Sequence, residues 1–299
     1  AITLLRNGGK GRLYGSFTDA EKTSLGIYAA WDGTEASGNL IDSHGSLDMT
    51  DNNTVTSASA MATGSRQFTA ATSEYFTTND HADLSVGDID FSYSAWFYLD
   101  TAASTYMELF RKWSGSGANR ETVLYTSGSK FVFDVSTDGA AGDSIRRVTN
   151  GLVLEVGKWY HVYLEHDAAN NHIGISVNNN TMVTTANTDG VNDGNATFRF
   201  SHSSSSFDGR MAKVGFWKRV LTTAERTEMI NSGSGMAYSV LTTAHKVSLV
   251  GYWNLDEASG NAIDSHDNGH DLSDSNTVTA AGGLTAAPPF SIHVRAQCT

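Results

Sequence analysis

The sequence predicts an all-β protein, an antiparallel sandwich of two sheets with a short helix after the last strand. Three observations predict it. The composition is 39% hydrophobic but only 17% charged, with 29 Gly and 2 Pro, a balance typical of turn-rich sheets. A long series of segments alternates large and small side chains between turn residues. A helix-start signature follows that series.

The expected strands follow one another from residue 91 to residue 217. Phe91–Leu99 shows the alternation most clearly, as expected for a strand that packs one face on a core. Asn178-Asn179-Asn180 offers residues that tolerate positive φ, which predicts a hairpin turn. The remaining expected strands are Met107–Trp113, Thr122–Thr126, Lys130–Ser136, Trp159–Glu165, His172–Val177, Thr181–Thr185, Ala196–Ser201 and Arg210–Trp217.

Two segments carry a helix-start pattern. Thr222 lies three residues before Glu225, so that each side chain can bond a free amide of the other residue. This predicts a helix from Thr222 to about Ile230. The same pattern in Thr18–Thr23 predicts a second short helix near the start of the chain.

An internal repeat organises the chain. Trp31–His44 returns as Trp253–His266, and Asn53–Thr56 returns as Asn276–Thr279 after a one-residue insertion. A repeat of this kind indicates related structural units. We therefore expect three parts: residues 1–26, which resemble the end of a unit; residues 27–240, a complete sandwich; and residues 241–299, which resemble the start of a second unit.

The last part is too short to rebuild a sandwich. It must therefore be cut short, pack on the first domain, or complete a neighbouring chain. In the third case the tail of one chain adds strands to the open sheet edge of the next, which gives a homo-oligomer. We give at least equal weight to the second case, in which the last part packs across the sandwich of its own chain.

Charge and cysteine content exclude several classes of protein. The net charge of −12, from 20 Lys+Arg against 32 Asp+Glu, argues against nucleic-acid binding, which needs clustered cations. No apolar run is long enough to cross a membrane. Cys298 is the single cysteine, so an intrachain disulfide is impossible.

Four stretches of the sequence resemble the laminin G-like or concanavalin A-like jelly rolls, in particular the bacterial and phage branch of that superfamily. The resemblance implies a jelly-roll sandwich of two curved antiparallel sheets, and a function in recognising glycans or proteins. It is carried by Trp253–Gly260 with its earlier copy, Phe91–Tyr98, Gly157–Val162, and Phe207–Trp217 with the following Thr222–Glu225.

Catalytic constellations are absent from the sequence. A retaining glycosidase needs two carboxylates about 5 Å apart, and Glu165-His-Asp167 lacks the third acid of the usual run. We interpret Glu165 as surface charge on the outer side of a strand. His161 reads as a structural strand residue and Ser203–Ser206 as a loop. The protein is therefore expected not to be an enzyme.

Calcium is the cofactor that the resemblance implies. Family members often hold Ca²⁺ with carboxylates and carbonyl oxygens near the turn after the first strand, and hard oxygen donors suit that ion. One departure weakens the expectation, because Ala212 stands where the family commonly has an acid. The residues expected to bind the metal are Asp42, Asp48 and Asp208, with Asp264 and Asp271 in the second copy.

A sugar-binding surface needs an exposed aromatic side chain beside polar groups. Trp113, which enters the Ser114–Gly117 loop, is the best candidate, and Tyr106 and Tyr125 are weaker ones. Packing in the core is the competing interpretation for all three. It is the preferred one for Trp96, Trp159 and Phe216, which lie within alternating strands.

The sequence thus favours a non-catalytic surface recognition or structural module with a glycan or a cell-surface or virion protein as partner. We expect it on a phage particle, as capsid decoration or tail appendage, or in a bacterial extracellular protein such as an adhesin. Its expected location is extracellular or on the virion surface. The alternatives are a divergent polysaccharide-cleaving enzyme and a virion protein without a ligand.

Overall fold

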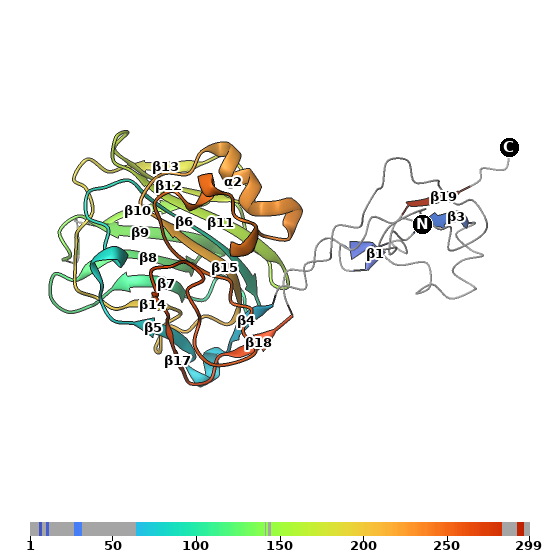
Figure 1. The fold of residues 1–299 in the computed structure, drawn as a ribbon, viewed down its shortest axis with the longest axis horizontal. Helices are drawn as coiled ribbons and strands as arrows, with labels where there is room; N and C mark the ends of the chain where they lie inside the picture. The colour runs from blue at the N-terminus through green and yellow to red at the C-terminus, as the bar shows by residue number, and fades with distance from the viewer. Residues whose placement is uncertain are drawn as a thin grey trace. The chain divides into compact units, whose positions relative to one another are not determined.

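The computed structural model describes residues 6–7, 10–11, 27–31, 64–140, 142, 145–282 and 292–295. The chain divides into two compact units. One comprises residues 1–62 and 285–299, and the other comprises residues 63–284. The second unit is the sandwich that contains the sites considered below (Figure 1).

Two strand pairs are described in the first unit. β1 (Arg6–Asn7) pairs with β2 (Lys10–Gly11), and β3 (Ile27–Trp31) pairs with β19 (Ile292–Arg295), both antiparallel. The expected helix at Thr18–Thr23 lies outside the described residues. Most of the N-terminal copy of the repeat also lies outside them, including the predicted metal ligands Asp42 and Asp48.

One sheet of the sandwich has eight antiparallel strands. Their order is β13-β12-β11-β6-β15-β4-β18, and β16 pairs with β15 beyond the register of β4. The strands are β4 (Ser65–Phe68), β6 (Phe91–Leu99), β11 (Trp159–Asp167), β12 (His172–Val177), β13 (Val183–Ala186), β15 (Gly209–Trp217), β16 (Leu249–Trp253) and β18 (Thr279–Ala281).

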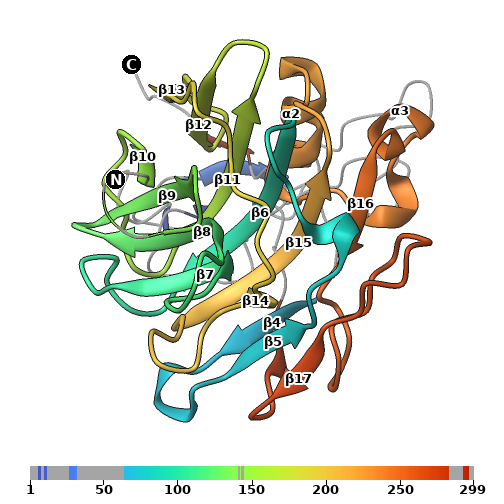
Figure 2. The same cartoon turned by 90° about the vertical axis from the view of Figure 1, so that its left-hand side faces the viewer.

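The other sheet has seven antiparallel strands, and the two sheets lie face to face (Figure 2). Their order is β10-β9-β8-β7-β14-β5-β17. The strands are β5 (Tyr75–Thr78), β7 (Met107–Trp113), β8 (Arg120–Ser127), β9 (Lys130–Ser136), β10 (Ile145–Thr149), β14 (Phe198–Phe200) and β17 (Ser273–Ser275).

Aromatic side chains fill the space between the sheets. The rings of Tyr93 and Phe216 stack at 4.5 Å, and Phe198 lies 5.7 Å from Trp253. Alternate residues of each central strand point into this layer, as the period of two along a strand requires. Burial of these rings supplies the main driving force for folding, since the described residues contain no disulfide.

Short helices connect and flank the strands. α2 (Thr223–Ile230) begins at Thr222, whose hydroxyl accepts a hydrogen bond from the amide of Glu225, while the Glu225 carboxylate accepts one from the Thr222 amide. The predicted capping arrangement is therefore confirmed. Among the described residues the other helices are α3 (Thr243–Lys246) and four 3₁₀ turns, η2 (Ala70–Thr72), η3 (Ala82–Leu84), η4 (Asn231–Gly233) and η5 (Tyr238–Val240).

The C-terminal copy of the repeat belongs to this same sandwich. β16 pairs with β15, β17 with β5, and β18 with β4. The Trp253 side chain is fully buried among the core aromatics. The boundary expected at residue 240 therefore lies inside the sandwich, and residues 249–281 pack on the domain of their own chain instead of beginning a second unit.

The predicted all-β sandwich is confirmed, and nine predicted strands correspond to β6, β7, β8, β9, β11, β12, β13, β14 and β15. Four match to the residue, and the others differ by a few residues at their ends. Asn178 and Asn179 have φ of 53° and 59°, as the predicted hairpin turn between β12 and β13 requires.

Candidate functional site

The two outer surfaces of the sandwich differ. The outer surface of the eight-stranded sheet, here called the covered face, carries Tyr163, Trp217 and Tyr252. Met229 of α2 and Leu241 after η5 pack on these rings, and all five side chains are buried. Helix α2 lies over this sheet in Figure 2. The covered face is therefore used for packing.

The outer surface of the seven-stranded sheet, here called the open face, has no helix over it among the described residues. Cross-strand pairing puts one row of side chains on this surface, because residues directly opposite each other in neighbouring strands point the same way. The row runs from β14 across β7, β8 and β9 to β10 and consists of Arg199, Arg111, Val123, Asp134 and Arg147.

Aromatic side chains lie beside this row. Val123, Tyr125 and Val132 form a small apolar cluster on the open face, and the half-buried Trp113 packs against it. The guanidinium of Arg120 lies 6.0 Å from the Trp113 ring. Trp113 is thus held in place from one side while part of its ring reaches solvent.

A groove of about 640 Å³ lies at the β7–β14 end of the open face. Trp113 forms one wall with the loop that follows it, and residues before and after β14 form the opposite wall. The lining residues are Glu108, Arg111, Trp113, Ser114, Gly115, Asn119, Asn195, Ala196, Thr197, Arg199 and His202. An aromatic ring, amides, hydroxyls and ion-pairing groups therefore share one groove.

A buried ion pair forms the floor of the groove. The Arg111 guanidinium contacts the Glu108 carboxylate at 2.5 Å and donates to the Trp113 carbonyl at 2.7 Å. The side chains of Arg111 and Glu108 are only 10% and 8% exposed. Burial and the neighbouring Arg111 charge lower the pKa of His202, whose Nδ1 lies 3.9 Å from Glu108. His202 is therefore neutral near pH 7.

Arg199 adds a cation without a carboxylate partner in the described part of the chain. Its Nε donates to the Thr197 hydroxyl at 2.9 Å, and its guanidinium lies 5.2 Å from the Tyr75 ring. An arginine held by one neutral bond and one ring keeps donors for a ligand. The groove thus offers hydrogen-bond donors in a chain whose net charge is −12.

The structure places the three predicted ligand residues on the open face with different accessibilities. Trp113 lines the groove. Tyr106 is 48% exposed and donates to Glu108 at 2.9 Å, whereas Tyr125 is only 7% exposed and donates to Asp134 at 3.2 Å. The two tyrosine rings lie 4.9 Å apart. Trp113 and Tyr106 can therefore contact a ligand, and Tyr125 supports them.

Asp208 lies at a second hollow of about 250 Å³, beside Tyr106 and the Ser203–Ser206 loop. Its Oδ1 accepts from the Ala70 amide at 3.3 Å, and its Oδ2 accepts from the Thr101 hydroxyl. Asp208 is the one carboxylate among the described lining residues. A single carboxylate does not fit the usual set of several charged ligands around Ca²⁺.

The other described residues that were predicted to bind metal, Asp264 and Asp271, accept hydrogen bonds from backbone amides. Asp264 is buried and accepts hydrogen bonds from the amides of Tyr252, His266 and His270 at 2.8–3.0 Å. Asp271 accepts one from the amide of Asp264 at 2.8 Å. Both carboxylates therefore hold the C-terminal copy in shape, and neither lies in a group of three metal-ligating side chains among the described residues.

Two residues weighed for catalysis lie beneath the covered face. Glu165 is 6% exposed and contacts Nε2 of His172 at 3.1 Å, so its interpretation as surface charge was wrong. Met182 and Glu165 both lie against Gly174 of the neighbouring strand, where the missing side chain leaves room for them. His161 bonds Ser94 at 2.8 Å, and burial lowers its pKa to about 3. It is structural, as predicted.

Sequence patterns missed most of the groove. Arg111 and Arg199 lie far apart in the sequence and meet only through the pairing of β7 with β14. The alternation of Phe198, Arg199 and Phe200 was the available signal, because it predicts one charged side chain facing away from a core.

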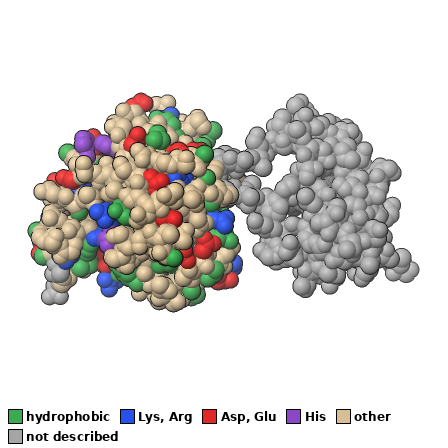
Figure 3. All heavy atoms as spheres, turned by 90° about the horizontal axis from the view of Figure 1, so that it is seen from below, with side chains coloured by type: hydrophobic (Ala, Val, Ile, Leu, Met, Phe, Trp, Pro, Cys, Tyr) green, Lys and Arg blue, Asp and Glu red, His purple; other side chains and the backbone are tan. Residues whose placement is uncertain are grey.

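Surface charge is mixed on one face of the sandwich. Acidic and basic side chains lie interspersed on the face drawn in Figure 3. This distribution differs from the continuous basic patch that nucleic-acid binding requires. None of the helices in the described residues has the length and apolar character needed to cross a membrane.

Comparisons with known proteins agree with the fold. The chain is similar over 74% of its length to a protein of Bacteroides ovatus to which carbohydrate binding has been assigned provisionally, with a TM-score of 0.53 and 19% identity. The match spans 60% of that protein. The SAP-like pentraxin of Limulus polyphemus, a heptamer, matches over 72% of this chain and 97% of its own, with a TM-score of 0.45 and 11% identity.

Comparison with curated protein sequences gives no match. A family model does match. It is described as the concanavalin A-like lectin/glucanase superfamily, and it aligns with residues 70–225, which is more than half of the 299 residues. The aligned region begins at η2 and ends in α2, so it includes the central strands of both sheets and the groove, but not β4, β16, β17 or β18. The chain therefore belongs to the concanavalin A-like lectin/glucanase superfamily.

Proposed function

We propose that this protein is a non-catalytic glycan-binding module that holds its ligand in the groove on the open face. The observation that carries the proposal is the position of Trp113, half-buried in the wall of a groove that also presents Arg111, Asn119 and Arg199. The fold and the family support the proposal, since superfamily members are lectins or glucanases by name.

The groove has the chemistry that a sugar needs. A pyranose ring has an apolar face that stacks on an aromatic side chain, and its hydroxyls need donors and acceptors at the rim. Trp113 offers the ring. Glu108 supplies acceptors, Asn119 supplies an amide, and the Arg199 guanidinium supplies donors. The volume of about 640 Å³ is within the range of small-ligand sites.

The pairing of the carboxylates on the open face supports the non-catalytic part of the proposal. Glu108 is paired with Arg111, and Asp134 receives two bonds from Arg147 at 2.8 and 2.7 Å. Each of these carboxylates is therefore held by an arginine of its own surface. Strand β8 also separates the two acids, because Glu108 lies on β7 and Asp134 on β9.

We place the module on an outer surface, either of a phage particle or of a bacterial cell. The superfamily includes lectins by name, and glycans that a lectin binds are displayed on cell surfaces. Calcium binding stays a prediction, because Asp42 and Asp48 lie outside the described residues and the described lining residues beside Asp208 offer no second carboxylate.

The test is glycan-array binding followed by calorimetry on the best glycan. Trp113→Ala is expected to weaken binding at least about tenfold, since stacking and its buried apolar area are lost. Trp159→Ala is the matched control. Trp159 is also partly buried, but it packs with Trp96 and Ala212 on the covered face, so its loss should leave glycan binding unchanged.

Two results would overturn the proposal. One is a protein that binds no glycan on the array, with or without added Ca²⁺. The other is equal binding by the Trp113→Ala and Trp159→Ala variants. The non-catalytic part is tested separately: cleavage of the bound glycan that disappears in Glu108→Gln would show an enzyme.

A further inference from the structure

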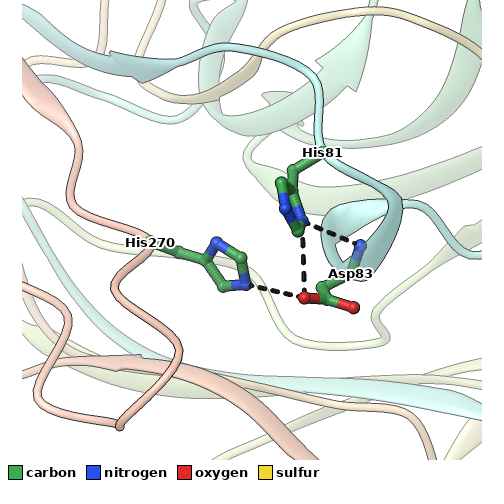
Figure 4. A group of neighbouring side chains, drawn as sticks. All are labelled: His81, Asp83 and His270. Atoms are coloured by element: carbon green, nitrogen blue, oxygen red, sulfur yellow. Dashed lines mark hydrogen bonds and ion pairs between the residues drawn. The ribbon is translucent and has the colours of Figure 1, made fainter.

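We propose that His81, Asp83 and His270 bind one transition-metal ion, with Zn²⁺ the best fit, and that the ion fastens the C-terminal copy of the repeat to the sandwich. The three side chains converge at one point, as Figure 4 shows, with the Asp83 carboxylate joined to both imidazoles. The proposed site lies outside the glycan groove, and none of its three ligands is a calcium ligand predicted from the sequence.

The distances suit a tetrahedral ion. Nδ1 of His81 lies 3.4 Å from Oδ2 of Asp83, and Nε2 of His270 lies 3.5 Å from the same oxygen. Ligands about 2.0–2.1 Å from a tetrahedral Zn²⁺ lie about 3.4 Å from one another. All three ligand atoms lie within 4.8 Å of one another, so small side-chain rotations complete the geometry.

A buried nitrogen without a partner points to a missing ligand. His270 is 7% exposed, and its Nε2 has no hydrogen-bond partner. An unsatisfied buried polar atom costs free energy. Metal coordination removes that cost. At His81, metal coordination would replace only the 3.2 Å hydrogen bond that Nδ1 accepts from the Asp83 amide.

The surrounding structure fixes both sides of the site. The backbone of His270 is held by Asp264, which accepts from its amide at 3.0 Å, and by the Trp253 indole, which donates to its carbonyl at 2.9 Å. On the other side, Leu84 of η3 is fully buried, and Lys218 donates to the Ala82 carbonyl at 3.1 Å. Positioned ligands of this kind favour metal binding.

The choice of metal follows from the ligands. Two imidazoles and one carboxylate suit Zn²⁺, and also Co²⁺, Ni²⁺ or Cu²⁺, better than Ca²⁺ or Mg²⁺. Three protein ligands leave a fourth position for water or for another donor.

The site would distinguish the two copies of the repeat. His270 lies six residues before Asn276 of the shared Asn-Thr-Val-Thr stretch, whereas Leu47 lies six residues before Asn53. Only the C-terminal copy therefore carries this histidine. Because His81 and Asp83 follow β5 and His270 precedes β17, the ion would join the loop after β5 to the segment that enters β17.

The experiment is calorimetric titration of the full, tag-free chain with Zn²⁺, together with the visible absorption of its Co²⁺ form. We expect one ion per chain, a tetrahedral Co²⁺ spectrum, and a rise in Tm of about 5 °C at saturating Zn²⁺. Hydrogen exchange of residues 266–274 should slow when Zn²⁺ is bound.

His81→Ala and Asp83→Ala test the assignment without endangering the fold, because both side chains are more than half exposed. Each should weaken Zn²⁺ binding about 100-fold and remove the Co²⁺ spectrum. His172→Ala is the control, since His172 also contacts a carboxylate but has no third ligand. Stoichiometric binding that persists in both test variants, or no Zn²⁺ binding by the unaltered chain, overturns the proposal.

Discussion

The covered face and the open face of the same sandwich carry equally large aromatic side chains but use them differently. On the covered face Trp217 is fully buried beneath residues that follow β15. On the open face Trp113 keeps part of its ring in solvent, beside paired charges and amides. The difference shows that a helical cover converts a sheet surface into core, whereas a surface without it remains available for a ligand.

The largest expected effect is on the covered face. Trp217→Ala should lower the free energy of unfolding by about 3–5 kcal/mol, because it leaves a cavity under Tyr252 and removes the bond from the indole to the His245 carbonyl. Urea unfolding measures the loss. Trp113→Ala should cost less than half as much, and equal losses would contradict the division into two faces.

A pH effect of similar total size is expected from His161, also beneath the covered face. Its folded pKa of about 3 lies below the ordinary value of 6.5, so the unfolded chain binds the proton first. The contribution of His161 to the free energy of unfolding is complete above pH 6.5. It falls by about 1.4 kcal/mol for each pH unit as the pH decreases toward 3. His161→Gln should flatten that part of the profile, and an unchanged slope would contradict the assignment.

A smaller effect is expected at the start of α2. Thr222→Ala removes the acceptor for the Glu225 amide and should cost about 1 kcal/mol. Because α2 covers the aromatic cluster, hydrogen exchange of Thr223–Ile230 should accelerate in the variant. Thr222→Ser is the control, since it keeps the hydroxyl and should retain most of the stability.

The smallest effect on stability is expected on the open face. Arg199→Gln should change the free energy of unfolding by no more than about 0.5 kcal/mol, because no described carboxylate pairs with Arg199. Glycan affinity should nevertheless fall severalfold, as donors are lost from the groove. A variant with full affinity would remove Arg199 from the binding site.

The sandwich could be predicted because its signals are local. Alternation in Phe91–Leu99, the triple asparagine at the β12–β13 hairpin and the Thr222–Glu225 cap each depend on neighbouring residues. β4, β5 and β10 were missed. All three are short. β4 and β5 pair with strands distant in the sequence, whereas β10 is an edge strand beside β9.

The candidate site was harder to predict because its parts come from several strands. Trp113 and Tyr106 were recognised as single side chains, but their environment depends on the pairing of β7 with β14 and β8. The site of His81, Asp83 and His270 could not be predicted from a metal-ligand spacing, because its two histidines lie near opposite ends of the sandwich sequence. Asp264 was predicted to be a metal ligand. The sequence does not show that its carboxylate accepts hydrogen bonds from three backbone amides.

The pairing of β17 and β18 with β5 and β4 has a consequence for synthesis on the ribosome. β4 and β5 leave the ribosome before their outer neighbours β18 and β17, which are translated some two hundred residues later. Until residue 281 has left the exit tunnel, the nascent chain presents unpaired strand edges and a vacant place for Trp253. Chaperones that shield such edges should therefore associate with this polypeptide between the synthesis of β4 and the synthesis of β18.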